Sequence, residues 1–111
     1  MREKTRTVIE KALVLAADTD QAYTMIPSDG AEVVIDKLMS SHTQSKDCAI
    51  CAMWDYGEAG ETLVEVANRG IKHLVGTGDG VKKLALLFSN NESVDSVPMD
   101  GIMIISEYED V

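Results

Sequence analysis

Apolar residues recur at helical spacing in three stretches of the chain. In the clearest of them, Asp29 and Glu32 have the spacing of a capping box, with two carboxylates at the positive end of a helix. The apolar residues that follow share one face of a helix: Ala31, Val34, Ile35, Leu38 and Met39. The same spacing predicts helices over residues 2–17 and 61–75.

The helix over 61–75 makes a detailed packing prediction. Its apolar positions fall on one face and its charged positions on the other. We therefore expect four side chains to be buried, namely Leu63, Ala67, Ile71 and Leu74. Three others are expected to be exposed, namely Glu65, Arg69 and Lys72.

Short, continuous apolar runs over 48–54, 81–88 and 101–106 predict buried strands, and residues 21–26 form a shorter candidate that ends at Pro27. The predicted order is α-β-α-β-α-β-β. This order favours an α/β fold: a small, mostly parallel sheet of about four strands with helices packed on it. A ferredoxin-like α+β fold with an antiparallel sheet remains the alternative. A length of 111 residues fits one domain that spans residues 1–111.

Charge narrows the classes of partner. The net charge is −9, and residues 89–111 contain six acids and no base. A surface of this kind repels phosphate backbones, so no direct nucleic-acid binding is expected. The acidic side chains either keep the protein in solution or form a surface that binds a basic partner.

Location is predicted from what the sequence lacks. The longest apolar run, residues 12–17, is far too short to cross a membrane, and no secretory signal is recognisable. We therefore predict a cytoplasmic protein with no membrane association.

Cys48 and Cys51 form a Cys-x-x-Cys motif that two kinds of chemistry use, metal binding and redox exchange. Here the motif lies inside a predicted strand, where residues three apart point to opposite faces. We expect both thiols to be reduced and buried, with no metal and no cofactor. A metal or redox protein remains an alternative.

A candidate ligand-binding site follows from the loops at the ends of the predicted strands. In a parallel sheet these loops gather at one edge, where open α/β sheets bind ligands. Tyr56 is suited to stacking on a flat ligand, and the amides around Gly57 to holding an anion. The predicted site residues are Ser28, Asp29, Asp55, Tyr56, Gly57, Asn90 and Asn91.

No nucleophile, base and acid stand at a spacing typical of catalysis, so an enzyme is the less favoured interpretation. We predict a small acidic cytoplasmic binding or regulatory protein that holds a partner protein or small ligand. The alternative is a nucleotide or anion sensor, or an enzyme, that uses the loop from Asp55 to Gly60. The apolar segment from Ile102 to Ile105 further predicts a homo-oligomer, because both of its faces need cover.

Overall fold

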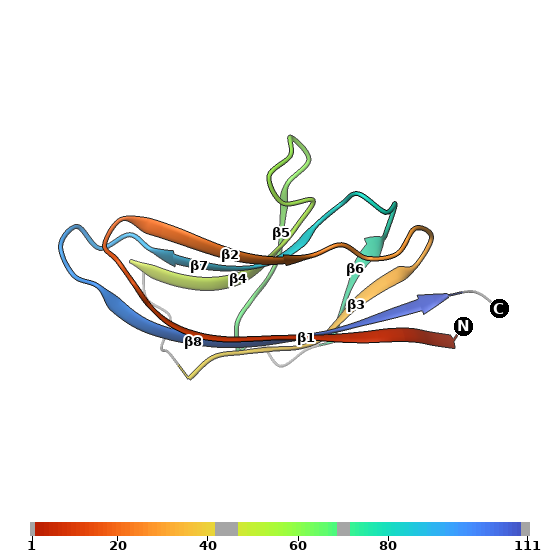
Figure 1. Cartoon of the computed structure of the whole chain (residues 1–111), viewed down its shortest axis with the longest axis horizontal. Helices are drawn as coiled ribbons and strands as arrows, with labels where there is room; N and C mark the ends of the chain where they lie inside the picture. Colours follow the sequence, from red (N-terminus) through yellow and green to blue (C-terminus); the bar gives the residue numbers. More distant parts are fainter. Residues whose placement is uncertain (1, 42–46, 69–71, 110–111) are drawn as a thin grey trace.

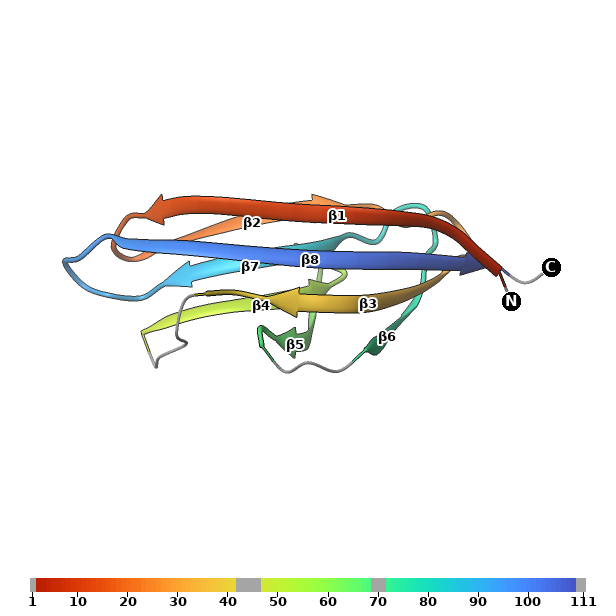
Figure 2. The ribbon, with the colours of Figure 1, turned by 90° about the horizontal axis from the view of Figure 1, so that it is seen from below.

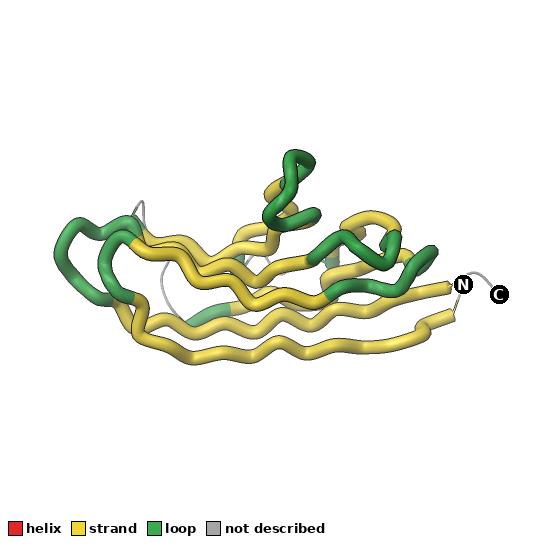
Figure 3. Tube along the Cα trace, turned by 45° about the horizontal axis from the view of Figure 1, so that its top comes forward, coloured by secondary structure: helices red, strands yellow, loops and turns green. Residues whose placement is uncertain are grey.

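A computed structural model describes residues 2–41, 47–68 and 72–109 of the chain, and all the regular secondary structure in these ranges is strand (Figure 3). No segment of them is a helix with the length and apolar character that crossing a membrane requires. The strands are β1 (Arg2–Leu15), β2 (Thr19–Met25), β3 (Glu32–Met39), β4 (Cys48–Trp54), β5 (Thr62–Val66), β6 (His73–Thr77), β7 (Leu84–Asn90) and β8 (Val97–Glu109).

The strands form two four-stranded sheets that pack face to face as a β-sandwich (Figure 1). Sheet A has the order β1-β8-β3-β6, and sheet B has the order β2-β7-β4-β5. Every pairing of neighbours is antiparallel. The predicted α/β fold is therefore wrong, because the described residues contain neither helices nor parallel pairs of strands. The ferredoxin-like alternative is wrong as well, because its helices are also missing from these residues.

The core lies between the sheets and follows the two-residue period of a strand. In β7, Leu84, Leu86 and Phe88 point inward and are fully buried. In β8, Met103 and Ile105 are equally buried. Gly101 on β8 leaves room for the ring of Phe88, since a Cβ on Gly101 would lie 3.1 Å from Phe88 Cζ.

The segment predicted as a capped helix is strand β3. Val33 and Ile35 point into the core, and a register shift between Ile35 and Lys37 then moves the inward position to Leu38. This bulge inserts one residue into the alternation, so the apolar spacing becomes irregular and imitates a helical stripe. Met39, expected to be buried, has 43% of its surface exposed.

The segment 61–75 is also not a helix, because it supplies β5 and β6, at the edges of the two sheets. Leu63 and Leu74 are 56% and 61% exposed, although the helix prediction buries them. Ala67 is buried as expected, while Ile71 and Arg69 lie outside the described residues. Residues 2–17, the third predicted helix, contain the long edge strand β1.

The predictions of strands are confirmed where apolar residues run without interruption. Residues 48–54 are β4, residues 21–26 overlap β2, residues 81–88 overlap β7, and residues 101–106 lie within β8. Such apolar runs predict strands that are covered on much of both faces. They do not predict whether those strands pair in parallel or antiparallel.

Two substitutions in β3 distinguish the strand from the helix that the sequence predicts. Val33→Ala removes a fully buried side chain and should lower the free energy of unfolding by about 1.5–3 kcal/mol. Met39→Ala should change it by no more than about 0.5 kcal/mol, because that side chain is partly exposed. Urea unfolding measures both values, and the reverse order of effects would favour the helix.

Candidate functional site

Three loops meet at one end of sheet B. Strands β2 and β4 both flank β7 and are antiparallel to it, so they run in the same direction and end opposite the same residue, Leu84. The loops that follow them, residues 26–31 and 55–61, therefore lie near the loop that precedes β7, residues 78–83 (Figure 1). We call these three segments the loop cluster.

Backbone hydrogen bonds join the loops of the cluster to one another. Gly30 N donates to Gly78 O, and Gly78 N donates to Ala31 O, both at 2.8 Å. Tyr56 N donates to Lys83 O at 3.1 Å. These bonds cross between different connections, so the cluster is a defined surface of the sandwich.

Glu107 anchors the cluster to the opposite sheet. Its side chain is buried and accepts a 2.7 Å hydrogen bond from Ser28 N and a 2.6 Å hydrogen bond from Thr5 Oγ1. A buried carboxylate is stable only with such donors. Glu107 is not among the predicted site residues. The one signal in the sequence that distinguishes it from the other acids is its position at the end of an apolar strand.

The β4–β5 loop, residues 55–61, rises away from sheet B and stands clear of the sandwich (Figure 1). Asp55 begins it in the left-handed region, with a φ of 57°, and Gly57 follows with a φ of 85°. Glu58 N donates to Asp55 O at 3.2 Å, and the carboxylate of Glu61 accepts from Gly57 N at 2.7 Å. The loop is thus a folded projection that carries three carboxylates, those of the exposed Glu58 and Glu61 and of the half-buried Asp55.

Asp79 gives the cluster a further fixed negative charge. The backbone N–H groups of Lys82 and Val81 donate to its carboxylate at 2.7 and 2.9 Å, and these bonds lower the pKa of Asp79. Lys82 and Lys83 are the two bases in the cluster. Acids outnumber bases there, so the loop cluster is negative.

The structure places the predicted site residues at opposite ends of sheet B. Ser28, Asp29, Asp55, Tyr56 and Gly57 all belong to the loop cluster. The predicted site also includes Asn90, the last residue of β7, and Asn91, and both lie at the far end of sheet B because β7 is antiparallel to β2 and β4.

The environment of Asn90 is that of a buried structural residue, which its position in the sequence does not predict. Its side chain is fully buried, and its amide donates to three backbone oxygens, those of Leu15, Ala16 and Asp95, at 2.9–3.2 Å. Its carbonyl accepts from Glu92 N at 2.9 Å. Asn90 therefore ties the β1–β2 turn to the β7–β8 loop.

The two cysteines are free and buried, as the sequence predicts. Cys48 faces the core, where its sulfur lies 3.7 Å from Asn90 Oδ1. Cys51 lies on the other face of β4, and burial, with the charges of Asp20 and Glu61, raises the pKa of its thiol to about 11. In the described part of the chain, no three side chains of His, Cys, Asp or Glu come close enough together to hold a metal ion.

A hollow on the surface lies away from the loop cluster. It is an open groove on the outer face of sheet A, with a volume of about 760 Å³. Both polar and apolar side chains line it, and none of the predicted site residues is among them.

Comparison with known proteins gives a likeness of fold. No protein-family model and no curated protein matches the chain. Among solved structures, the chain is similar to the crystal structure of Aeromonas hydrophila PliG, a periplasmic inhibitor of g-type lysozyme. The two share 10% sequence identity with a TM-score of 0.55, over 93% of this chain and 86% of that one. At this identity the likeness supports the β-sandwich architecture.

The structure and this comparison correct the functional prediction. The sensor or enzyme at the Asp55–Gly60 loop was predicted from the strand ends of an α/β fold, which the chain does not have. The cytoplasmic regulatory protein was predicted from size, acidity and the lack of a catalytic set, and the likeness to a periplasmic inhibitor contradicts it. The Cys-x-x-Cys alternative was predicted from the motif, whose two cysteines lie on opposite faces of β4. The similar fold belongs to a periplasmic inhibitor, so the comparison also contradicts the predicted cytoplasmic location.

A pair of neighbouring asparagines tests the structural role of Asn90. Asn90→Ala should lower the free energy of unfolding by about 2–4 kcal/mol, because several buried backbone oxygens lose their donor. Asn91→Ala, at an exposed side chain, should change it by no more than about 0.5 kcal/mol. Equal effects in urea unfolding would contradict this role.

The raised pKa of Cys51 predicts slow thiol chemistry. With a pKa of about 11, only about one thiol in a thousand is ionised at pH 8, so labelling by a disulfide reagent should be slow and should accelerate as the pH approaches 11. Urea should expose both thiols to rapid labelling. Cys51→Ser identifies which thiol reacts, and rapid labelling of folded protein at Cys51 would show that the thiol is not protected.

Proposed function

We propose that this protein acts outside the cytoplasm as an inhibitor that binds a lysozyme through the loop cluster. The observation that carries the proposal is the β4–β5 loop, which projects from the sandwich with three carboxylates. The fold likeness to a periplasmic inhibitor of g-type lysozyme names the class of partner.

The shape of the loop cluster suits insertion into a concave partner. The β4–β5 loop is held in its raised form by hydrogen bonds within itself and by the bond from Tyr56 N to Lys83 O. A loop ordered before binding loses little conformational entropy when a partner encloses it. Tyr56 adds an aromatic ring of the type that anchors protein interfaces.

The charge of the cluster suits a basic partner. Asp29, Asp55, Glu58, Glu61 and Asp79 all belong to the loop cluster at one end of sheet B, and the whole chain carries −9. Such a field speeds the approach of a positively charged protein and discourages acidic ones. Binding of this kind uses no catalytic group of this chain.

A charge reversal on the projecting loop tests the proposal. Glu58→Lys should weaken inhibition of g-type lysozyme about tenfold at low ionic strength, because it removes an attractive charge and adds a repulsive one. The assay follows the loss of turbidity of a bacterial cell-wall suspension and the affinity of the two purified proteins. Raising the salt concentration should shrink the difference between the variant and the original chain.

Asp95→Lys is the matched control, since it makes the same change of charge at an exposed position in the β7–β8 loop, at the far end of the sandwich. It should leave inhibition within about twofold. Equal losses from the two variants would mean that only net charge matters. Absence of binding to g-type and other lysozymes at micromolar concentration would contradict the proposal.

A further inference from the structure

Figure 2 views the molecule from below, on the side of strands β1, β8 and β3 of sheet A. This outer face combines an open groove with exposed apolar side chains. Ile102 and Ile104 of β8 point outward along its centre and are half-buried. Val8 on one side and Met39 on the other are 54% and 43% exposed. No strand or loop of the described residues covers this face (Figure 1).

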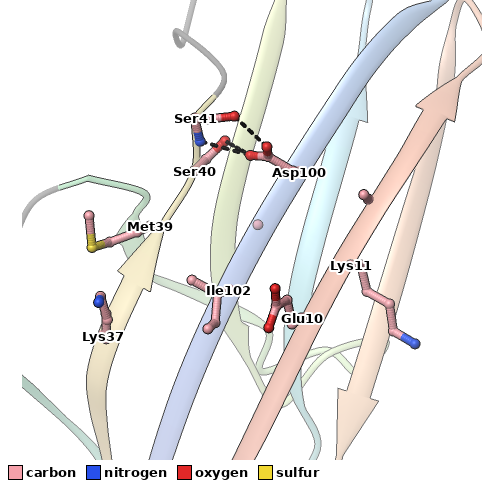
Figure 4. A pocket seen from close by; sticks show the side chains of 10 residues that line it. Glu10, Lys11, Lys37, Met39, Ser40, Ser41, Asp100 and Ile102 are labelled. Carbon is pink, nitrogen blue, oxygen red and sulfur yellow. Dashed lines mark hydrogen bonds between the residues drawn. The ribbon is translucent and has the colours of Figure 1, made fainter.

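The charges on this face are nearly balanced, unlike those of the rest of the chain. Arg6 pairs with Glu3, and Lys72 pairs with Asp36. Asp100 accepts hydrogen bonds from Ser40 and Ser41 at the end of the groove (Figure 4). The face can therefore approach another copy of itself without the repulsion that a charge of −9 otherwise causes.

The groove also contains Glu10 and Lys37, which form no ion pair within the described residues. They come from β1 and β3, on the two sides of β8 (Figure 4). The registers place Val8, Ile104 and Lys37 in one row across the sheet, and Glu10, Ile102 and Met39 in the next outward-facing row.

We infer that the outer face of sheet A is the interface of a two-fold symmetric dimer, with the axis parallel to β8. That axis places β1 of one protomer over β3 of its partner, because rotation exchanges the two sides of the sheet. Ile102 and Ile104 then meet the same residues of the second copy. Glu10 lies diagonally opposite the partner's Lys37, so each unpaired charge gains an opposite one.

The size of the face is sufficient for a stable dimer. Strands β1 and β8, spaced about 4.8 Å apart, run together over the 13 residues of β8, a length of about 43 Å at about 3.3 Å per residue, and the 8 residues of β3 add a third strand about 26 Å long. The face thus covers about 540 Å² per protomer, or about 1,080 Å² for the pair, above the roughly 1,000 Å² that a biological interface needs.

This dimer does not depend on the proposed lysozyme inhibition. The β4–β5 loop rises from sheet B, on the side of the sandwich opposite the interface (Figure 1). Both loop clusters of a dimer therefore stay accessible and point away from each other.

Sedimentation equilibrium from micromolar to millimolar protein tests the inference, since the monomer has a mass of 12.1 kDa and a dimer twice that. Val8→Lys should raise the dimer Kd at least about tenfold, because the row that Val8 shares with Lys37 places each new ammonium group opposite the partner's Lys37. Val94→Lys, at a side chain 81% exposed in the β7–β8 loop, is the control and should leave the Kd unchanged. Far-ultraviolet circular dichroism should confirm that both variants fold.

A charge exchange identifies the orientation of the two protomers. Glu10→Lys and Lys37→Glu should each raise the Kd several-fold, and the double variant should restore it to within about threefold of the original. Within one chain the two residues lie about 12 Å apart across β8, too far for strong coupling in physiological salt. A monomer at every concentration, a dimer insensitive to Val8→Lys, or a double variant that is not restored would overturn the inference.

Discussion

The pairing of β8 with β1 and β3 is the constraint on which the sandwich depends. β8 is one of the two central strands of sheet A. It pairs with β1 along its whole length, from Val97 opposite Leu15 to Glu109 opposite Arg2. Its inward residues close the core, and its register places Glu107 where it can hold the loop cluster through Ser28. Because this pairing links the first and last parts of the chain, sheet A forms only when nearly the whole chain has been placed.

Several elements were predictable because their cause is local. Residues 48–54 read as a strand since every position is apolar, and the loops after β2 and β4 were expected to lie together. That last expectation is right for a reason other than the predicted one. β2 and β4 run in the same direction because both are antiparallel to β7, and Asn90 lies at the other end for the same reason.

The errors arise where the regular alternation of a strand is broken. The bulge in β3 moves the inward position from Ile35 to Leu38, and a register shift between β4 and β5 near Leu63 has a similar effect. Both produce apolar spacings of three and four residues, which are those of a helix. Pairing across about 90 residues, as between β1 and β8, leaves no local pattern in one sequence.

The loop cluster and the outer face of sheet A differ in charge, and for this reason we propose different partners for them. The loop cluster concentrates carboxylates on a raised loop, where their field extends into solvent and attracts a basic protein. The outer face of sheet A neutralises its own charges and exposes apolar strands, which favours contact with a surface of the same kind. A dimer built on the neutral face carries two negative loop clusters on opposite sides, so self-association and partner binding do not compete for one surface.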